Sequence, residues 1–336
     1  MFEAKSLLPP APAQLLATDG TPLCGRFAGR GGAADWSALR GSWQRGPLWR
    51  RLHHKRWLYA GFGNAHCFIG CAVVDTGWAG AAFVYVFDRH RRQVCGGMSL
   101  TGLPGLNAQL ANLPDTPQQF RQGKKLVRFG YAGNERWTIL AEDGSGFRLE
   151  AELDGSNAAP WLLAVGPVTG GSVHSTHKSA ALHGSGYVQM GQDRLSLDHT
   201  LGSLDHSNGL LPRHTSWRWA CAHGQHVGFN LQSGYFGDHE NALWLDGELI
   251  PLAGAQFEFD HTRPLQPWHI RTADGLLDLR FEAEGLRQEN RDLLIAASRY
   301  VQPIGVFNGW VKRSPDADPV PVQQLLGVTE DHYSRW

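Results

Sequence analysis

The sequence predicts an all-β fold in which many short antiparallel strands form two barrels or sandwiches packed side by side. Three observations support this prediction. Apolar and polar residues alternate along much of the chain, turn dipeptides separate the alternating runs, and helical periodicity is nearly absent. The composition agrees with it, because only 18% of residues are charged while Gly numbers 41 and Trp 13, a mix that suits turns and broad aromatic surfaces.

The predicted strands are runs of alternating residues that bury one face each. In order along the chain, the clearest of them cover residues 83–87, 147–153, 227–232, 256–259 and 277–282. Asp-Gly dipeptides at 154–155, 246–247 and 274–275 supply the positive backbone angles that antiparallel hairpins need. The second half of the chain thus shows the same pattern of alternating strands and turns as the first half.

Two segments rich in turn-forming residues are predicted to connect strands. Residues 101–125 carry three prolines and are expected to form a long loop or a short helix, a length that suits a lid or plug. Residues 153–172 are dense in Gly, Pro, Ser and Asn, and they place a domain boundary near residue 165. We therefore expect an N-terminal β domain over 1–165 and a C-terminal β domain over 166–336.

Length and charge exclude several classes of partner. The chain has 336 residues, enough for a sizeable core, and its 31 basic side chains balance 31 acidic ones, so it lacks the field that attracts nucleic acid. No uncharged apolar run approaches the roughly 20 residues of a membrane helix, so stable membrane insertion is not expected. Prolines interrupt the N-terminal region where a signal peptide would lie, which predicts a cytoplasmic protein. The sequence does not predict an oligomeric partner.

Cysteine and histidine give no clear metal or cofactor signature. The five Cys form no CxxC pair and are expected to be reduced thiols, mostly buried. Nine of the 16 His fall between His174 and His239, which leaves two interpretations, a metal site or a chance cluster of strand-end and surface residues. Because HExxH and other recognisable ligand spacings are missing, we predict no metal. Gly-rich phosphate loops are missing too, and we predict no cofactor.

The stretch LDHSNGLLPRHTSWRWA, residues 204–220, concentrates functional side chains. Asp205 and His206 precede Ser-Asn-Gly, which predicts a turn, and an alternating strand follows in which Trp217 and Trp219 share a face. In one interpretation Asp205 caps the turn and the two Trp fill a barrel. In the other, a Trp-lined cavity desolvates Asp205, raises its pKa and makes it a general acid.

Further polar and aromatic residues are candidates for substrate binding. Asn230 lies on the polar face of its strand, where its amide can orient a substrate oxygen or face solvent. Glu240 and Asn241 precede an apolar strand that contains Trp244, and form either a polar anchor or the end of a hairpin loop. Near the C-terminus, Glu330, Asp331 and His332 are interpreted as salt bridges of a closing strand or, alternatively, as functional residues.

Several motifs resemble an uncharacterised family, domain of unknown function 2804. They are KRWLYAGFGNAHCFIGCAVVDTGWAGAAFVYVFD at 55–88, the Asp-His stretch, GFNL at 228–231, ENALWLDGE at 240–248, QPIGVFNG at 302–309 and EDHYSRW at 330–336. The resemblance covers the chain from about residue 50 to its end. It implies family membership and no particular activity.

A more distant resemblance bears on chemistry. Asp205-His206-x-x-Gly209 followed by Trp217-x-Trp219 is similar to the pattern of the carotenoid 1,2-hydratase and AttH-like group, whose members are two lipocalin-like (calycin-like) barrels side by side. The resemblance implies that Asp205 protonates a C=C bond with His206 as its orienting or proton-exchanging neighbour. The group often has an aromatic residue where this chain has Asn208.

The resemblance therefore leaves the cation-stabilising surface to other aromatic residues, for which Trp217, Trp219 and Trp244 are the candidates.

From these observations we expect cofactor-independent, acid-promoted hydration, isomerisation or cyclisation of a lipophilic unsaturated small molecule, in a pocket near the domain interface. Such an enzyme is a hydro-lyase, an isomerase or a cyclase. Lys178 and Arg213 are candidate anchors for a carboxylate or carbonyl end of the ligand, or else exposed charges. The alternative is a non-catalytic carrier of a hydrophobic metabolite or lipid, which needs the pocket but not the acid.

Overall fold

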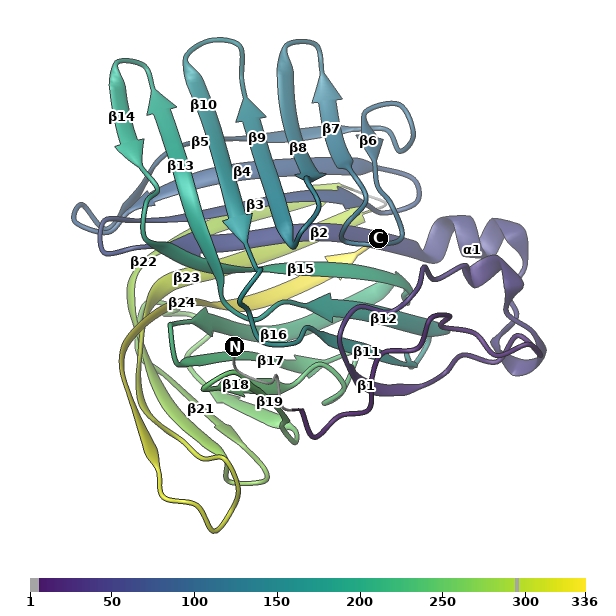
Figure 1. Ribbon diagram of the computed structural model, residues 1–336. Helices are drawn as coiled ribbons and strands as arrows, with labels where there is room; N and C mark the ends of the chain where they lie inside the picture. The colour runs from purple at the N-terminus through teal and green to yellow at the C-terminus, as the bar shows by residue number, and fades with distance from the viewer. Residues whose placement is uncertain (1–5, 294–295) are drawn as a thin grey trace.

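The protein is nearly all β, and its strands form a nearly closed barrel sheet and a half-barrel sheet (Figure 1). This computed structural model describes residues 6–293 and 296–336. Strands hold 59% of the residues and helices 4%. The predicted all-β fold of two barrel-like units is therefore confirmed. Among the described residues, no helix has the length and apolar character needed to cross a bilayer.

The first sheet contains 15 strands, and the central part of its order is β5-β4-β3-β2-β15-β13-β10-β9-β8-β7-β6. Its strands are β1 Gly25–Ala28, β2 His54–Gly63, β3 Cys67–Asp75, β4 Gly80–Asp88, β5 Gln93–Gly102, β6 Ala108–Gln109, β7 Gln118–Gln122, β8 Lys125–Tyr131, β9 Arg136–Glu142, β10 Phe147–Asp154, β11 Leu162–Pro167, β12 Val173–Lys178, β13 Leu182–Met190, β14 Asp193–Ser196 and β15 Thr200–Leu210. Strand β12 pairs with both β11 and β15. The short helices are η1 Trp36–Ala38, η2 Gly41–Trp43 and α1 Pro47–His53.

The second sheet contains nine strands in the order β19-β18-β17-β16-β24-β23-β22-β21-β20. They are β16 His214–His223, β17 Val227–Gly234, β18 Ala242–Leu245, β19 Glu248–Pro251, β20 Ala255–Glu258, β21 Trp268–Thr272, β22 Leu277–Leu293, β23 Ala296–Val311 and β24 Val320–Arg335. The long strands β22, β23 and β24 extend from this sheet towards the first one (Figure 1). They supply much of the surface that faces the first sheet.

The chain passes from the first sheet to the second at residues 211–213, between β15 and β16. Strands β12 to β15 pair in the first sheet, although they follow residue 165. The division into two domains over 1–165 and 166–336 stays a prediction, and it does not coincide with the passage between sheets. The prediction that residues 101–125 form a loop or a short helix is wrong, because this segment includes β6, β7 and the start of β8.

The turn predicted at 207–209 is also wrong, because these residues lie inside β15. Hydrogen-bonded neighbours flank this part of the strand on both sides, β2 on one and β12 on the other. Asn208, which favours turns, instead accepts hydrogen bonds through its side-chain oxygen from Trp36 Nε1 at 2.9 Å and His54 Nε2 at 2.7 Å. Tertiary pairing thus overrides the local turn propensity of Ser-Asn-Gly.

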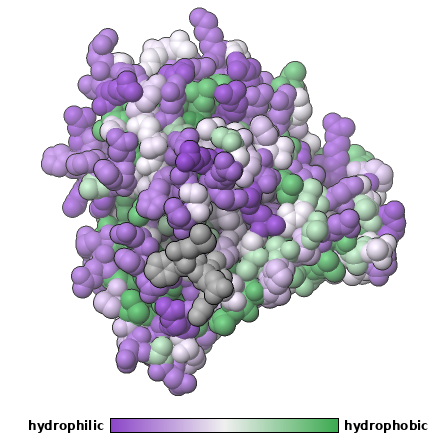
Figure 2. Space-filling view, viewed as in Figure 1, coloured by the Kyte–Doolittle hydropathy of each residue, from purple (hydrophilic) through white to green (hydrophobic). Residues whose placement is uncertain are grey.

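Each sheet surrounds its own apolar core, and a third cluster joins the sheets. Phe62 and Trp137 are fully buried in the first core, and Phe281 and Phe307 in the second. The third cluster combines residues of β2, β3 and β4 with residues of β16, β23 and β24. The outer surface is mainly hydrophilic on the face in Figure 2, with apolar side chains scattered over it. The space between the sheets is therefore the place where apolar residues of both sheets meet.

Replacing Phe307 should test the second core. Its ring packs between Phe229, at a centroid distance of 5.0 Å, and Phe281, at 4.7 Å. Phe307→Ala should lower the free energy of unfolding by about 3–5 kcal/mol, because it removes buried surface and leaves a cavity. Leu265→Ala is the control, since Leu265 is 49% exposed, and should change it by less than about 0.5 kcal/mol in urea denaturation. Equal effects of the two changes would contradict this assignment of the core.

Candidate functional site

A cavity of about 630 Å³ lies between the two sheets. Strands β2, β3, β4, β12 and β15 of the first sheet line it from one side, and β16, β17, β22, β23 and β24 of the second sheet line it from the other. Its volume falls within the range of roughly 300–1,000 Å³ that is typical of small-molecule sites. The sequence-based prediction of a pocket between two β units thus has a structural counterpart.

Aromatic rings from both sheets form much of the cavity wall. Trp57 of β2 stacks on Trp217 of β16 with ring centroids 6.3 Å apart, and Tyr59 meets Trp219 edge to face at 5.7 Å. Tyr235, which follows β17, packs edge to face against Trp217 at 5.7 Å. These contacts arise because side chains two apart on a strand share a face, so Trp57 and Tyr59 oppose Trp217 and Trp219. The rings offer π faces to a ligand in the cavity.

A buried ionic cluster joins this wall. Lys178 Nζ lies 2.6 Å from Asp205 Oδ2 and 3.1 Å from Glu240 Oε2. The side chains of Lys178 and Glu240 are each 4% exposed, and that of Asp205 is 13% exposed. All three residues line the cavity. Two carboxylates therefore share one ammonium group in a site that is almost closed to bulk water.

Strand register explains how the cluster forms. Lys178 on β12 and Asp205 on β15 are directly paired, so their side chains lie next to each other on one face. Thr176 and Ser207, two residues away on the same strands, direct their hydroxyl groups at Asp205 Oδ1 from 3.4 and 3.3 Å. Glu240 comes from the turn between β17 and β18 of the second sheet. The cluster is thus complete only where the two sheets meet.

The charges of the cluster change the proton affinities of its members. Burial raises the pKa of Glu240, the Lys178 ammonium opposes this shift, and the Asp205 carboxylate adds to it, so that the pKa lies above its ordinary value of 4.5. Burial alone would lower the pKa of Lys178, but Asp205 and Glu240 outweigh burial and hold this pKa above its ordinary value. Lys178 and Glu240 therefore both hold a proton more tightly than they would in water.

His206 does not join the cluster, which contradicts its predicted role as a neighbour that orients Asp205. As the next residue on β15, it points to the opposite face of the sheet. Its Nε2 lies 3.2 Å from the carbonyl oxygen of Ala111, and its ring is 5.7 Å from that of His177. Burial lowers the pKa of His206 to about 4, so the ring is neutral near pH 7. It does not line the cavity.

Asn230 supports the site from behind the cavity wall. Its side-chain oxygen accepts a hydrogen bond from Trp219 Nε1 at 2.8 Å, and its Nδ2 donates one to the carbonyl oxygen of Glu240 at 2.9 Å. Asn241 holds the same turn, since its Oδ1 accepts from the backbone N–H of Gln232 at 2.6 Å. Both Asn residues thus position Trp219 and Glu240, and neither lines the cavity.

Two other predicted binding residues lie elsewhere. Trp244 donates its indole N–H to the carbonyl oxygen of Pro160 at 2.8 Å and packs in a core cluster near β11. Arg213 is exposed at the passage between the sheets, where its carbonyl oxygen accepts from the backbone N–H of Trp336 at 2.9 Å. Neither residue lines the cavity. Lys178, Asp205, Trp217, Trp219 and Glu240 are the predicted site residues that the fold brings together around it.

The sequence interpretation missed a second polar group on the cavity wall. Glu330 accepts hydrogen bonds from Trp217 Nε1 at 2.8 Å and from Gln302 Nε2 at 3.1 Å, and His332 Nδ1 lies 3.2 Å away. Glu330 and His332 face the cavity because they alternate with Asp331, which binds arginines outside it. The salt bridges predicted for this strand hold for Asp331. The period-two alternation of a strand was the signal in the sequence that could have placed Glu330 and His332 on the opposite face from Asp331.

Tyr235 links the two polar groups of the cavity. Burial raises the pKa of its hydroxyl, and the carboxylates of Glu240, Asp205 and Glu330 each raise it further. Tyr235 therefore lies within electrostatic reach of all three acids. Its hydroxyl and His174 Nε2 are 3.4 Å apart. Among the described residues, no three His, Cys, Asp or Glu side chains gather in a way that would hold a metal ion.

Comparisons with known proteins agree with this architecture. The family model described as "Domain of unknown function (DUF2804)" matches residues 10–336. The fold is similar to that of CghA with Sch210972, at a TM-score of 0.59, 10% identity and coverage of 97% of both chains. It is also similar to kievitone hydratase from Nectria haematococca, at a TM-score of 0.55, 10% identity and coverage of 98% of both chains.

A third similar structure is a putative AttH from Nitrosomonas europaea, at a TM-score of 0.51 and 12% identity, covering 88% of this chain and 97% of that one. At these identities the likeness concerns the fold. No curated protein matches the chain.

The raised pKa of Glu240 predicts that Glu240→Gln changes stability in a pH-dependent way. The folded chain holds this proton more tightly than the unfolded chain does. The group therefore favours folding fully below its ordinary pKa of 4.5, and this contribution is lost as the pH rises through the raised pKa. The Glu240→Gln variant does not lose this stability contribution as the pH rises, because glutamine does not titrate. Urea denaturation should show the variant gaining stability relative to the wild type above about pH 5, by up to ~1.4 kcal/mol per pH unit.

Asp316→Asn is the matched control, since Asp316 is exposed on the loop between β23 and β24. Its stability relative to the wild type should stay constant over the same pH range. A constant difference for Glu240→Gln as well would show that Glu240 binds its proton no more tightly in the folded chain.

Proposed function

The chain belongs to the family described as domain of unknown function DUF2804, and we propose that it performs acid-promoted hydration, isomerisation or cyclisation of a lipophilic unsaturated small molecule. The observation that carries the proposal is the Lys178–Asp205–Glu240 cluster on the wall of an aromatic cavity. Such a wall suits an apolar ligand, and the cluster offers it a proton. The name of one similar structure, a hydratase, agrees with this reaction class.

The proton comes from the carboxyl pair, with Glu240 as its holder at rest. Asp205 pairs with Lys178, whose ammonium is 2.6 Å from its Oδ2, and two hydroxyl groups face its other oxygen. The negative charge of Asp205 in turn favours the protonated form of Glu240. A carboxyl group whose pKa a neighbouring carboxylate raises is a common arrangement for general acid–base chemistry. The predicted acid Asp205 thus acts here as one member of a pair.

The aromatic wall would stabilise the cation that forms after protonation of a C=C bond. Trp217, Trp219 and Tyr59 present rings to the cavity, and an aromatic face attracts positive charge by about 2 kcal/mol in a desolvated site. The indole N–H groups of both Trp donate to protein acceptors, which fixes the orientation of the rings. These rings take the place of the aromatic residue that this chain lacks at Asn208.

A lipid or metabolite carrier is the second candidate, and the cavity alone would serve it. The ionic cluster argues against this use. Burying two carboxyl groups and an ammonium group costs free energy that well-packed apolar side chains would not, so a site for passive apolar binding has no need of them. The cluster is expected to be retained for chemistry.

Substitutions in the carboxyl pair should have distinct effects on proton transfer. In D2O, the wild-type chain should introduce deuterium at a carbon of farnesol or geranylgeraniol, as measured by mass spectrometry. Glu240→Gln should lower this rate by about 10²–10⁴-fold at every pH, since it removes the proton donor. Asp205→Asn should instead move the rate optimum to lower pH, because loss of the Asp205 charge lowers the pKa of Glu240.

The exposed-site variant Asp316→Asn should keep the wild-type rate and pH profile. If neither farnesol nor geranylgeraniol takes up deuterium while a fluorescent apolar probe still binds, the result would support the carrier function. Equal pH profiles for Asp205→Asn and the wild type would show that Asp205 does not tune the acid.

Filling the cavity should abolish ligand binding without touching the acids. Ala81 of β4 lines the cavity, and Ala81→Trp adds an indole there. We expect at least about tenfold weaker binding of a fluorescent apolar probe, because the added ring occupies the space of the ligand. Leu106→Trp, at a position that is 72% exposed, is the control and should bind as the wild type does. Unchanged binding in Ala81→Trp would place the probe site outside the cavity.

A further inference from the structure

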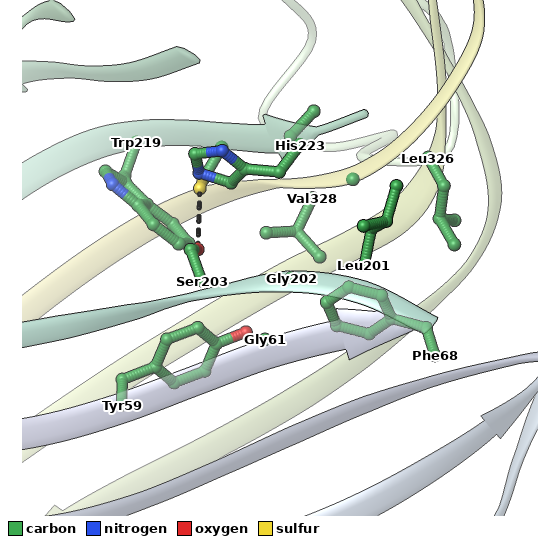
Figure 3. A pocket seen from close by; sticks show the side chains of 13 residues that line it. Tyr59, Gly61, Phe68, Leu201, Gly202, Ser203, Trp219, His223, Leu326 and Val328 are labelled. Carbon is green, nitrogen blue, oxygen red and sulfur yellow. Dashed lines mark hydrogen bonds between the residues drawn. The ribbon is translucent and has the colours of Figure 1, made fainter. Parts of the chain in front are cut away.

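Figure 3 shows a second, smaller pocket of about 20 Å³. It adjoins the cavity, because Tyr59 and Trp219 line both spaces. Around the small pocket, Figure 3 shows Ser203 and His223 near these rings and Phe68 at the opposite end. The volume is close to what one water molecule needs, roughly 10–15 Å³ by the same measure.

A missing side chain creates this pocket. Gly61 lies two residues after Tyr59 on β2, on the same face, and pairs directly with Ser203 of β15. A Cβ atom at Gly61 would lie 2.8 Å from the Tyr59 hydroxyl and 3.1 Å from the ring of Phe68. The hydroxyl of Tyr59 therefore leans over Gly61 into the space that a larger residue would fill.

The pocket is polar where it meets Tyr59 and Ser203. Tyr59 is 8% exposed, and its hydroxyl makes no hydrogen bond of good geometry among the described residues, although it interacts with the Tyr85 hydroxyl closely enough to offset part of the rise that burial causes in the pKa of Tyr85. The Ser203 hydroxyl is 3.5 Å from Cys221 Sγ, a weak partner that leaves its capacity largely free. His223 closes the polar end as a neutral ring, since burial lowers its pKa to about 3. A buried polar group without a partner is costly, and a bound water molecule would satisfy it.

The pocket also lies close to the ionic cluster. Ser203 precedes Asp205 by two residues on β15, which corresponds to about 7 Å along the strand. The Cys221 thiol feels the charges of Lys178, Asp205 and Glu240, although burial is the main reason that its pKa rises to about 12. The pocket is thus close enough to the cluster for its charges to act on a group in the pocket wall.

We propose that the small pocket binds a single water molecule and that this water is the nucleophile of a hydration reaction in the adjoining cavity. The inference rests on the proposed function and narrows it to hydration. Tyr59 and Ser203 hold the water through its hydrogen bonds, and the water reaches the ligand past the edge of the Tyr59 ring.

The reaction balances with water as the only co-reactant. The proton of Glu240 and the π electron pair form a C–H bond at one alkene carbon, which leaves a cation at the other. A lone pair of the water oxygen then forms a C–O bond with that carbon. The proton that the bound water loses returns to the carboxylate of Glu240. The alkene and one water thereby become an alcohol, and the acid is restored.

A crystal structure of the wild-type chain tests the site itself. We expect electron density for one water within about 3.2 Å of Tyr59 Oη and Ser203 Oγ. In Gly61→Ala the added methyl group should displace this water. In Ser203→Ala the water loses a hydrogen-bond partner, so its density should weaken although no volume is added. The second variant still tests the site if Gly61→Ala does not fold. Absence of water density in the wild-type pocket would overturn the site, whatever the result for turnover.

Product analysis with farnesol tests the role of the water. Gly61→Ala and Ser203→Ala should form alcohol at least about tenfold more slowly, while deuterium from D2O still enters the alkene. Gly254→Ala is the control, because a methyl group there meets no atom within 4 Å, and it should hydrate as the wild type does. Deuterium uptake with unchanged alcohol formation in both pocket variants would refute the nucleophile and leave the proposed function standing. No deuterium uptake by the wild type would refute the proposed function itself.

Discussion

The contact of one ammonium group with two carboxylates underlies the whole site. Lys178 and Asp205 belong to the first sheet, whereas Glu240 belongs to a turn of the second, so the cluster spans the gap between them. Buried charges of this kind tolerate little displacement, because each loses its hydration and depends on its partners at close range. The relative position of the two sheets therefore sets the proton affinity of Glu240. Any change in sheet packing that moves Glu240 away from Asp205 would also change its acidity.

The framework that fixes this contact consists of regular strands. Asp205 sits in β15 with hydrogen-bonded neighbours on both sides, and Lys178 is its direct partner on β12. On the second sheet, Asn230 ties the indole of Trp219 to the backbone of Glu240. The side chains at the site are therefore held by central strands and buried amides, which limits their motion more than an exposed loop would.

Period-two alternation was enough to predict the fold class, the shared face of Trp217 and Trp219, and the pocket between β units. Local signals failed where distant strands decide the outcome. Ser-Asn-Gly at 207–209 favours a turn by its own chemistry, yet pairing to β2 and β12 makes it strand. The same pairing turns His206 away from the cavity. The role of Glu240 depends on Lys178, 62 positions earlier, a contact that no local pattern encodes.

The location of the cavity follows from how each sheet fills its own interior. Large rings such as those of Phe62 and Phe307 pack the two cores completely, and a close-packed core has no room for a ligand. Among the described residues, the large cavity lies between the sheets, where small residues such as Gly61 and Ala72 stand beside aromatic ones. Apolar side chains at positions 178, 205 and 240 would close this interface more stably than a buried ammonium group and two carboxyl groups do. The cluster is therefore a cost in stability, which the proposed acid chemistry would explain.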